Sequence, residues 1–118
     1  MPKKVVITGM GINSSIGNTV GEHFYALTHR QAGISRIENV ATIHADHIKV
    51  GEIKRTNAEL FSALGLPEVN AYSRTSLLGI IALQEAIANA GLTPSALTHC
   101  GLIMASTVGG MDMTENYF

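Results

Sequence analysis

Two short apolar runs and one long apolar segment dominate the hydropathy pattern of the chain. Val5–Thr8 and Gly101–Ser106 carry no charge, and each run leads into a glycine turn. This pattern is typical of strands buried on both faces of a parallel sheet. From Ser73 to Ala90, apolar residues cover most of the circumference of an expected helix, so we expect that helix to be buried on more than one side. The pattern predicts an α/β fold.

A second helix is predicted near the N-terminus by its capping residues. Thr19 and Glu22 have the spacing of a capping box, in which Thr19 caps the helix and Glu22 reaches back to it. Val20, Phe24 and Leu27 follow at helical spacing. We expect these three side chains to cover the sheet.

Smaller elements are indicated between and after these segments. Ile48 and Val50 alternate with polar neighbours and predict a peripheral strand. Gly91 is the expected left-handed terminator of the long helix. Residues 111–118 have the pattern of the first turns of a further helix.

The predicted sheet has too few strands to be stable alone. Parallel sheets need several strands and helices on both faces, and only two inner strands are evident in 118 residues. We therefore expect residues 1–118 to be one incomplete N-terminal part of a larger α/β fold, or to require a second chain.

Composition and charge narrow the class of protein. Hydrophobic residues make up 46% of the chain and charged residues 14%, which is a globular composition, and the net charge of −1 does not favour nucleic-acid binding. All eight Lys and Arg residues lie at or before Arg74, and from Thr75 onward the only charges are Glu85, Asp112 and Glu115. The single cysteine, Cys100, excludes an internal disulfide, and no apolar stretch reaches membrane-spanning length. We expect a cytoplasmic protein without a membrane partner.

The glycine-rich stretch after the first apolar run invites a nucleotide-binding interpretation. Gly9 and Gly11 fit a dinucleotide fingerprint, but Ser14 stands where the third glycine is needed. A phosphate loop has four residues between its glycines and then a lysine, whereas five separate Gly11 from Gly17 and Asn18 follows. Structural turn glycines are the better interpretation, and no cofactor is expected.

Two other clusters carry chemistry-bearing side chains. In a strand, His99 and Cys100 would point to opposite faces, so the imidazole could not activate the thiol, and a small buried cysteine is the better interpretation. His44, Asp46 and His47 offer three metal ligands, but no further ligand lies near them in the sequence. A solvated loop is the better prediction there, with no metal.

Isolated histidines and methionines add little. His23 and His29 fall in the first predicted helix without a visible acidic partner, although His29 could favour the helix dipole. Met104, Met111 and Met113 are typical of core or pocket filler.

Four segments together resemble a known family. "VVITGMGINSSIGN" at the N-terminus, "QAGIS" at 31–35, "ALQEAIANAGL" at 82–92 and "GLIMASTVGG" at 101–110 are similar, in order and spacing, to segments of the β-ketoacyl-acyl-carrier-protein synthases. These are the condensing enzymes of fatty-acid and polyketide synthesis. The resemblance covers the whole chain.

The resemblance implies a layered thiolase-type fold, a homodimer and an acyl carrier protein as partner. It implies acyl transfer to a cysteine, followed by attack of a decarboxylated malonyl thioester. No catalytic residue can be carried over, because the family's nucleophilic cysteine and histidines lie beyond the part matched here, so this chain alone is expected to be inactive. A non-catalytic partner subunit that influences chain length remains the alternative.

The resemblance also assigns a substrate-binding turn. Thr107, Val108, Gly109 and Gly110 match the turn that lines the acyl pocket near the dimer interface, with Val108 as the wall residue. The alternative is that these residues only close a turn.

The stretch before the long helix departs from the family's pattern for carrier docking. Many relatives carry consecutive basic residues before the long helix, whereas Arg74 is the only positive charge in that stretch here. Lys49, Lys54 and Arg55 could substitute if the fold brings them near.

Overall fold

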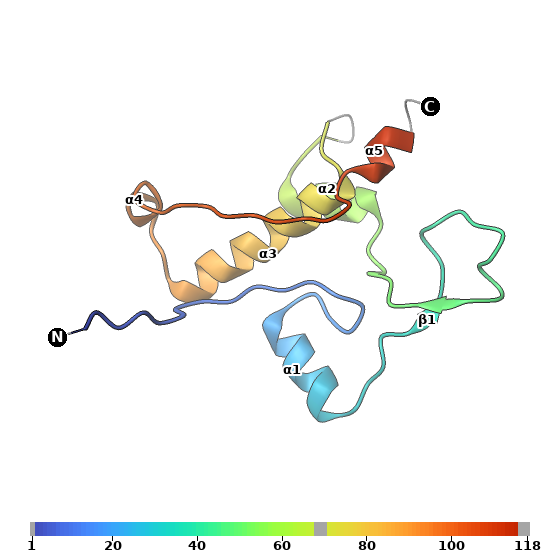
Figure 1. Cartoon of the computed structure of the whole chain (residues 1–118), viewed down its shortest axis with the longest axis horizontal. Coiled ribbons are helices and arrows are strands. Elements are labelled where there is room, and N and C mark those ends of the chain that lie inside the picture. The colour runs from blue at the N-terminus through green and yellow to red at the C-terminus, as the bar shows by residue number, and fades with distance from the viewer. Residues whose placement is uncertain (1, 68–70, 116–118) are drawn as a thin grey trace.

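The computed structural model describes residues 2–67 and 71–115, which combine helices with little sheet (Figure 1). The elements in chain order are α1 (Val20–Thr28), β1 (Ser35–Arg36), β2 (Lys49–Val50), α2 (Asn57–Leu64), α3 (Arg74–Ala90), α4 (Pro94–Leu97) and α5 (Met111–Glu115). The two strands are antiparallel. In the register, Ser35 pairs with Val50 and Arg36 with Lys49, so the predicted peripheral strand is confirmed.

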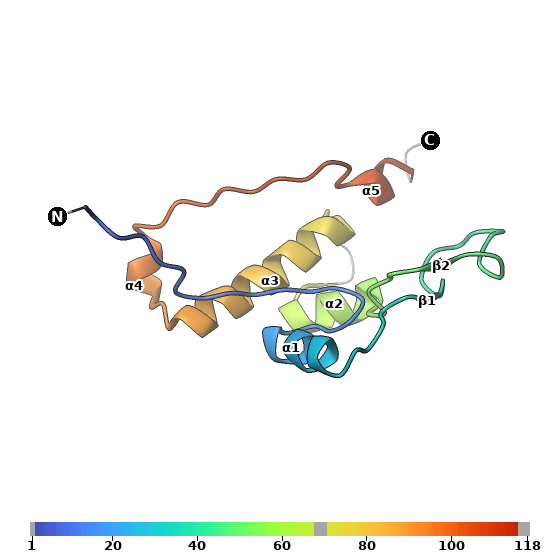
Figure 2. The same ribbon diagram turned by 60° about the horizontal axis from the view of Figure 1, so that its bottom comes forward.

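Helix α3 is the longest element, and its ends are those that the sequence predicts. The side chain of Ser73 accepts a hydrogen bond from the backbone N–H of Ser76 at 3.2 Å and caps the first turn. Gly91 ends the helix with a φ of 64°, a left-handed conformation that glycine adopts without a steric penalty. The segment before α1 and the segment between α4 and α5 both run along α3 (Figures 1 and 2).

The described residues contain no parallel sheet. Residues 5–8 and 101–106 are extended but belong to no strand, and the side chains of Val5 and Ile103 are 96% and 98% exposed. A strand depends on hydrogen bonds from a neighbouring strand, and among residues 2–67 and 71–115 neither segment has one. The radius of gyration, 16.9 Å, accordingly exceeds the roughly 13 Å of a compact domain of about 100 residues.

Helix α1 begins where it was predicted but buries a different face. The hydroxyl of Thr19 caps the N–H of Glu22 at 3.2 Å, whereas the carboxylate of Glu22 accepts from the N–H of Asn18 at 2.6 Å, not from Thr19. Phe24 and Leu27 are exposed because no sheet lies beneath them. The buried residues of α1 are His23 and Ala26, and a Cβ at Gly17 would lie 3.1 Å from the backbone nitrogen of His23.

Helix α2 was not predicted, although its start carries a clear sequence signal. Thr56 and Glu59 form a complete capping box, with the Thr56 hydroxyl bound to the Glu59 N–H at 3.3 Å and the Glu59 carboxylate bound to the Thr56 N–H at 2.7 Å. Gly65 ends the helix with a φ of 64°. Hydrogen bonds at both ends therefore define this two-turn helix.

The apolar core lies where α2 and α3 contact each other. Leu60 of α2 and Leu77 of α3 are fully buried. The rest of α3 is less buried than its sequence predicts, and Leu83 is 39% exposed. No helix in the described part of the chain is long and apolar enough to cross a membrane.

Candidate functional site

The glycine-rich loop lies directly against helix α3. A Cβ at Gly9 would lie 2.7 Å from the Cβ of Ala90, and a Cβ at Gly11 would overlap the carbonyl oxygen of Ala82 and lie 2.8 Å from the nitrogen of Ala86. Neither glycine has a positive φ. The two glycines are therefore required for close approach of the loop to the helix, and not for a tight turn.

Side chains of α3 occupy the backbone donors that a phosphate would need. The carboxylate of Glu85 accepts from the N–H groups of Ile12 at 2.9 Å and Val20 at 2.7 Å. The side-chain carbonyl of Asn89 accepts from the N–H of Met10 at 3.2 Å. Phosphate loops bind their ligand through free backbone N–H groups. The structure thus agrees with the sequence in disfavouring a nucleotide site here.

The buried imidazole of His23 joins the loop to α1. Its Nδ1 lies 2.7 Å from the carbonyl oxygen of Thr19, which can only accept, so Nδ1 carries the proton. In the neutral imidazole, Nε2, 2.6 Å from Oγ of Ser14, then accepts the hydroxyl proton. His29 stacks on Tyr25 with ring centroids 3.9 Å apart, and its Nδ1 lies 2.9 Å from the Tyr25 carbonyl. Both rings have structural partners.

The predicted substrate-binding residues Thr107, Val108, Gly109 and Gly110 form one turn between the extended segment 101–106 and α5. Gly109 donates its N–H to Oγ of Ser106 at 2.9 Å, and Gly110 has a φ of 87°, which favours glycine. The side chain of Val108 is 69% exposed. A Cβ at Gly109 would lie 3.1 Å from Cγ2 of Thr75, so the turn lies against the first turn of α3.

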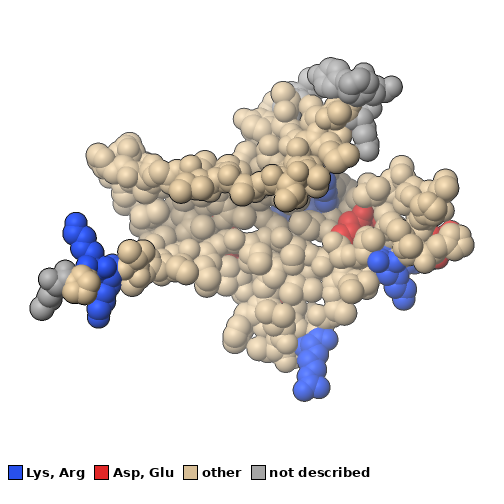
Figure 3. Space-filling view, in the orientation of Figure 1, with Lys and Arg blue, Asp and Glu red and all other residues tan. Residues whose placement is uncertain are grey.

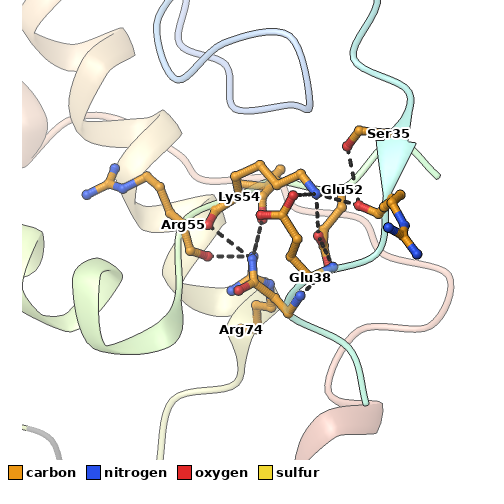
Figure 4. A network of polar contacts seen from close by, with 9 residues as sticks. Ser35, Glu38, Glu52, Lys54, Arg55 and Arg74 are labelled. Atoms are coloured by element: carbon orange, nitrogen blue, oxygen red, sulfur yellow. Dashed lines mark hydrogen bonds and ion pairs between the residues drawn. The ribbon is translucent and has the colours of Figure 1, made fainter. Parts of the chain in front are cut away.

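Arg74 makes hydrogen bonds both to the residues around the start of α2 and to α5, which follows the turn (Figure 4). Its guanidinium donates to the carbonyl oxygens of Ile53 and Arg55 and to Oδ1 of Asn57, each at 2.8 Å. Its backbone N–H donates to Oδ2 of Asp112 in α5, also at 2.8 Å. The guanidinium therefore anchors the residues before α2 and is engaged within the chain.

Beside these contacts of Arg74 lies a cavity of about 720 Å³. Residues of four separate parts of the chain line it, including Asn39, Glu52, Asn57, Arg74, Leu78 and Asp112. Glu52, one of these residues, has a side chain that is only 7% exposed. It accepts from the N–H groups of Glu38 and Asn39 at 2.9 Å and 2.8 Å and from Nζ of Lys54 at 2.9 Å.

These hydrogen bonds change the acidity of both side chains. The pKa of Glu52 is lowered from 4.5 to about 2, and the hydrogen bond from Lys54 is the largest cause. The two backbone N–H groups also lower this pKa, whereas burial acts to raise it. Burial acts to lower the pKa of Lys54, but hydrogen bonds to Glu52 and Glu38 outweigh it and raise that pKa. Lys54 also donates to the carbonyl of Arg36 at 2.6 Å. The ammonium group is thus held in place by the chain (Figure 4).

The lowered pKa predicts an acid-sensitive fold around Glu52. A carboxyl with a depressed folded-state pKa stabilises the fold above its unfolded pKa, and this contribution is lost as the pH falls. Here the window runs from about 4.5 down to about 2. We expect the midpoint temperature of thermal unfolding to fall steeply as the pH is lowered across this range. In the Glu52→Gln variant this midpoint should depend less on pH. An unchanged acid profile in Glu52→Gln, measured by circular dichroism, would show that Glu52 does not carry it.

The fold brings the segment that carries Lys54 and Arg55 against Arg74, whose guanidinium donates to the Arg55 carbonyl oxygen at 2.8 Å. Lys54 and Arg74 are engaged as described, and Lys49 is exposed on β2. Arg55 is half-buried, and its guanidinium lies 3.4 Å from the carbonyl oxygen of Glu59. On the face seen in Figure 3 the charged side chains are scattered.

The candidate metal-binding cluster lies in an exposed segment. His44, Asp46 and His47 fall in a turn closed by the His47 N–H and the His44 carbonyl at 2.9 Å, and Asp46 pairs with Arg36. The loop prediction is thereby confirmed, and within residues 2–67 and 71–115 no group of His, Cys, Asp or Glu is arranged to bind a metal.

The prediction of a buried cysteine is wrong. Cys100 is exposed, because the segment that follows α4 does not enter a sheet, and its Sγ lies 3.4 Å from the carbonyl of Ala96. Met104 and Met111 are likewise 66% and 57% exposed rather than core residues. The same unpaired segment, which runs to the glycine turn, explains the exposure of Met104.

Comparison with known proteins places the chain in a family. Residues 2–117 match the family model described as beta-ketoacyl synthase, N-terminal domain. The chain is 31% identical over 114 residues to the chloroplastic 3-oxoacyl-[acyl-carrier-protein] synthase II of Arabidopsis thaliana, which covers 92% of this chain and 21% of that protein. It is 29% identical over 115 residues to 3-oxoacyl-[acyl-carrier-protein] synthase 2 of Vibrio cholerae, covering 96% and 27%.

A similar relation holds for 3-oxoacyl-[acyl-carrier-protein] synthase 2 of Staphylococcus aureus strain COL, at 32% identity over 115 residues, 96% of this chain and 27% of the relative. The chain therefore spans about a quarter of the length of these relatives. No solved structure matches the chain significantly.

Proposed function

Because the chain belongs to the β-ketoacyl synthase family, in its N-terminal domain, we propose that it is part of a condensing enzyme that elongates acyl chains. The match of the family model to residues 2–117 carries this proposal. The relatives are named as 3-oxoacyl-[acyl-carrier-protein] synthases, which supports fatty-acid synthesis as the process and an acyl carrier protein as the partner.

The proposed reaction joins an acyl group to a malonyl-derived unit. An acyl group passes from a carrier thioester to an enzyme cysteine, and the carrier thiol is released. Loss of CO2 from malonyl-carrier thioester leaves a carbanion, which attacks the acyl carbonyl carbon and displaces the cysteine thiolate. The cysteine and the groups that stabilise the developing charge are supplied by polypeptide outside residues 1–118. Cys100 is not the nucleophile, since its thiol is exposed beside the carbonyl of Ala96 and has no cationic or imidazole partner among the contacts described for it.

The exposed extended segments support an incomplete fold. Residues 5–8 and 101–106 expose Val5, Ile7 and Ile103 by more than four-fifths, and such apolar segments are stable when covered. We propose that they become inner strands of a layered thiolase-type sheet, completed by further polypeptide in a cytoplasmic homodimer. Within it, Thr107, Val108, Gly109 and Gly110 line the acyl pocket.

The test is a condensation assay on the protein as its gene encodes it. With acyl-carrier and malonyl-carrier thioesters we expect release of CO2 and formation of a 3-oxoacyl-carrier product, and none from residues 1–118 alone. The matched control is Cys100→Ser, which should retain activity. A folded protein that transfers no acyl group would contradict the proposal, and activity appearing only with a second, different subunit would indicate the non-catalytic partner instead.

A further inference from the structure

We propose that Asp112 is a positioning residue that sets acyl-chain selectivity by fixing the turn Thr107–Gly110 against the start of α3; this inference rests on the proposed function. Asp112 is the second residue of α5, which begins directly after Gly110. Its carboxylate reaches across to α3 and accepts the backbone N–H of Arg74 at 2.8 Å.

The start of α3 is a favourable position for a carboxylate for two reasons. Arg74 is the first residue of α3, so its N–H is one of the donors that a helix leaves unpaired at its start. A negative charge there is also favoured by the helix dipole. Ser73 caps a different donor, the N–H of Ser76. Asp112 thus adds a long-range cap to a helix that already has a local one.

The α3 side of this contact is firmly anchored. The guanidinium of Arg74 donates to the carbonyls of Ile53 and Arg55 and to Asn57. A helix start held in this way is a fixed point, and the element at the other end of the Asp112 bond takes its position from it.

Among the contacts described for residues 107–110, few others restrain the turn. A Cβ at Gly109 would lie 3.1 Å from Cγ2 of Thr75, and the N–H of Gly109 bonds to Ser106 within the turn itself. Thr107, Val108 and Gly109 are exposed. The first turn of α5 closes on the carbonyl of Gly110, which accepts from the N–H groups of Met113 and Thr114 at 3.1 Å and 3.2 Å. Because Asp112 lies within this closed turn, its bond to Arg74 fixes Gly110 and, through it, the position of Val108.

If Asp112 holds Val108 in the wall of the acyl pocket, then removing its carboxylate should change acyl-chain selectivity. A single methylene in an apolar pocket changes kcat/KM by about 10–200-fold, so a shift of Val108 should change which acyl lengths are accepted. We expect Asp112→Ala to reduce the ratio of kcat/KM between the preferred acyl length and one two carbons longer by about tenfold. Asp112→Asn should preserve the ratio within about twofold, because its Oδ1 can still accept the Arg74 N–H.

The experiment measures kcat/KM for a series of acyl-carrier thioesters with the full-length protein and its variants, together with amide hydrogen exchange. Asp46→Ala is the control, because Asp46 is the other aspartate of the chain and pairs with Arg36 at the surface. Faster exchange at the Arg74 amide and in residues 107–112, a changed selectivity in Asp112→Ala and rescue by Asp112→Asn support the proposal. Unchanged selectivity in an active Asp112→Ala protein overturns it, whereas an unsubstituted protein that condenses no acyl length overturns the proposed function.

Discussion

Replacing Leu77 by alanine is expected to lower the free energy of unfolding of the protein by about 2–5 kcal/mol. Leu77 is fully buried in α3, which contacts α2, and Leu60 of α2 is the other large side chain that is fully buried among the described residues. Truncation removes buried methyl groups and leaves a cavity, and both effects favour the unfolded chain. With so few fully buried side chains, each one carries a large share of the core.

The control for this prediction is Leu83→Ala in the same helix. Leucine and alanine have similar helix propensities, and Leu83 is 39% exposed, so this change should cost about 1 kcal/mol or less. Urea unfolding of the three proteins, followed by far-ultraviolet circular dichroism, measures the difference. Equal losses from Leu77→Ala and Leu83→Ala would show that the α2–α3 contact is not the stabilising centre.

Local signals in the sequence predicted α1 and α3. Ser73 and Gly91 delimit α3, and Thr19 starts α1, because capping depends on hydrogen bonds within a few residues. The capping box of Thr56 and Glu59 at the start of α2 is a local signal of the same kind. Local chemistry therefore accounts for most element boundaries.

Local signals could not predict that residues 5–8 and 101–106 are unpaired in the described chain. Val5–Thr8 and Gly101–Ser106 have the composition of inner strands, but a strand exists only when a neighbour supplies its hydrogen bonds. No local pattern states whether that neighbour is present. The exposed faces of Phe24 and Leu27 have the same origin, since they were predicted to cover that sheet.

The candidate site was partly predictable. The turn Thr107–Gly110 follows from its glycines, but the contacts of Asp112 and Glu85 span 38 and 65 or more residues and leave no periodic signal. One hint exists: from Thr75 onward only Glu85, Asp112 and Glu115 are charged. Glu85 and Asp112 each accept a hydrogen bond at the first residue of a helix, Val20 of α1 and Arg74 of α3 respectively. The structure shows that these two isolated acids are long-range helix caps.

Replacing Gly11 by alanine is expected to destabilise the protein by about 1–3 kcal/mol, the usual cost of forcing an extra carbon into a filled space. The added Cβ would overlap the carbonyl oxygen of Ala82 and lie 2.8 Å from the nitrogen of Ala86. Both are backbone atoms of α3 and cannot rotate away. The loop would have to move off the helix, which weakens the bond from the Ile12 N–H to Glu85.

Gly21→Ala is the matched control, because it adds the same carbon where space is open. A Cβ at Gly21 would lie 4.0 Å from its nearest neighbour, and the residue sits in α1, where alanine is favoured over glycine by about 1 kcal/mol. The midpoint temperature of thermal unfolding should therefore decrease for Gly11→Ala and increase for Gly21→Ala. Because a nucleotide-binding loop also needs its glycines, titration with NAD or ATP separates the two explanations. Loss of a saturable nucleotide affinity in Gly11→Ala, with unchanged stability, would mean that the glycine serves a ligand and not the contact with α3.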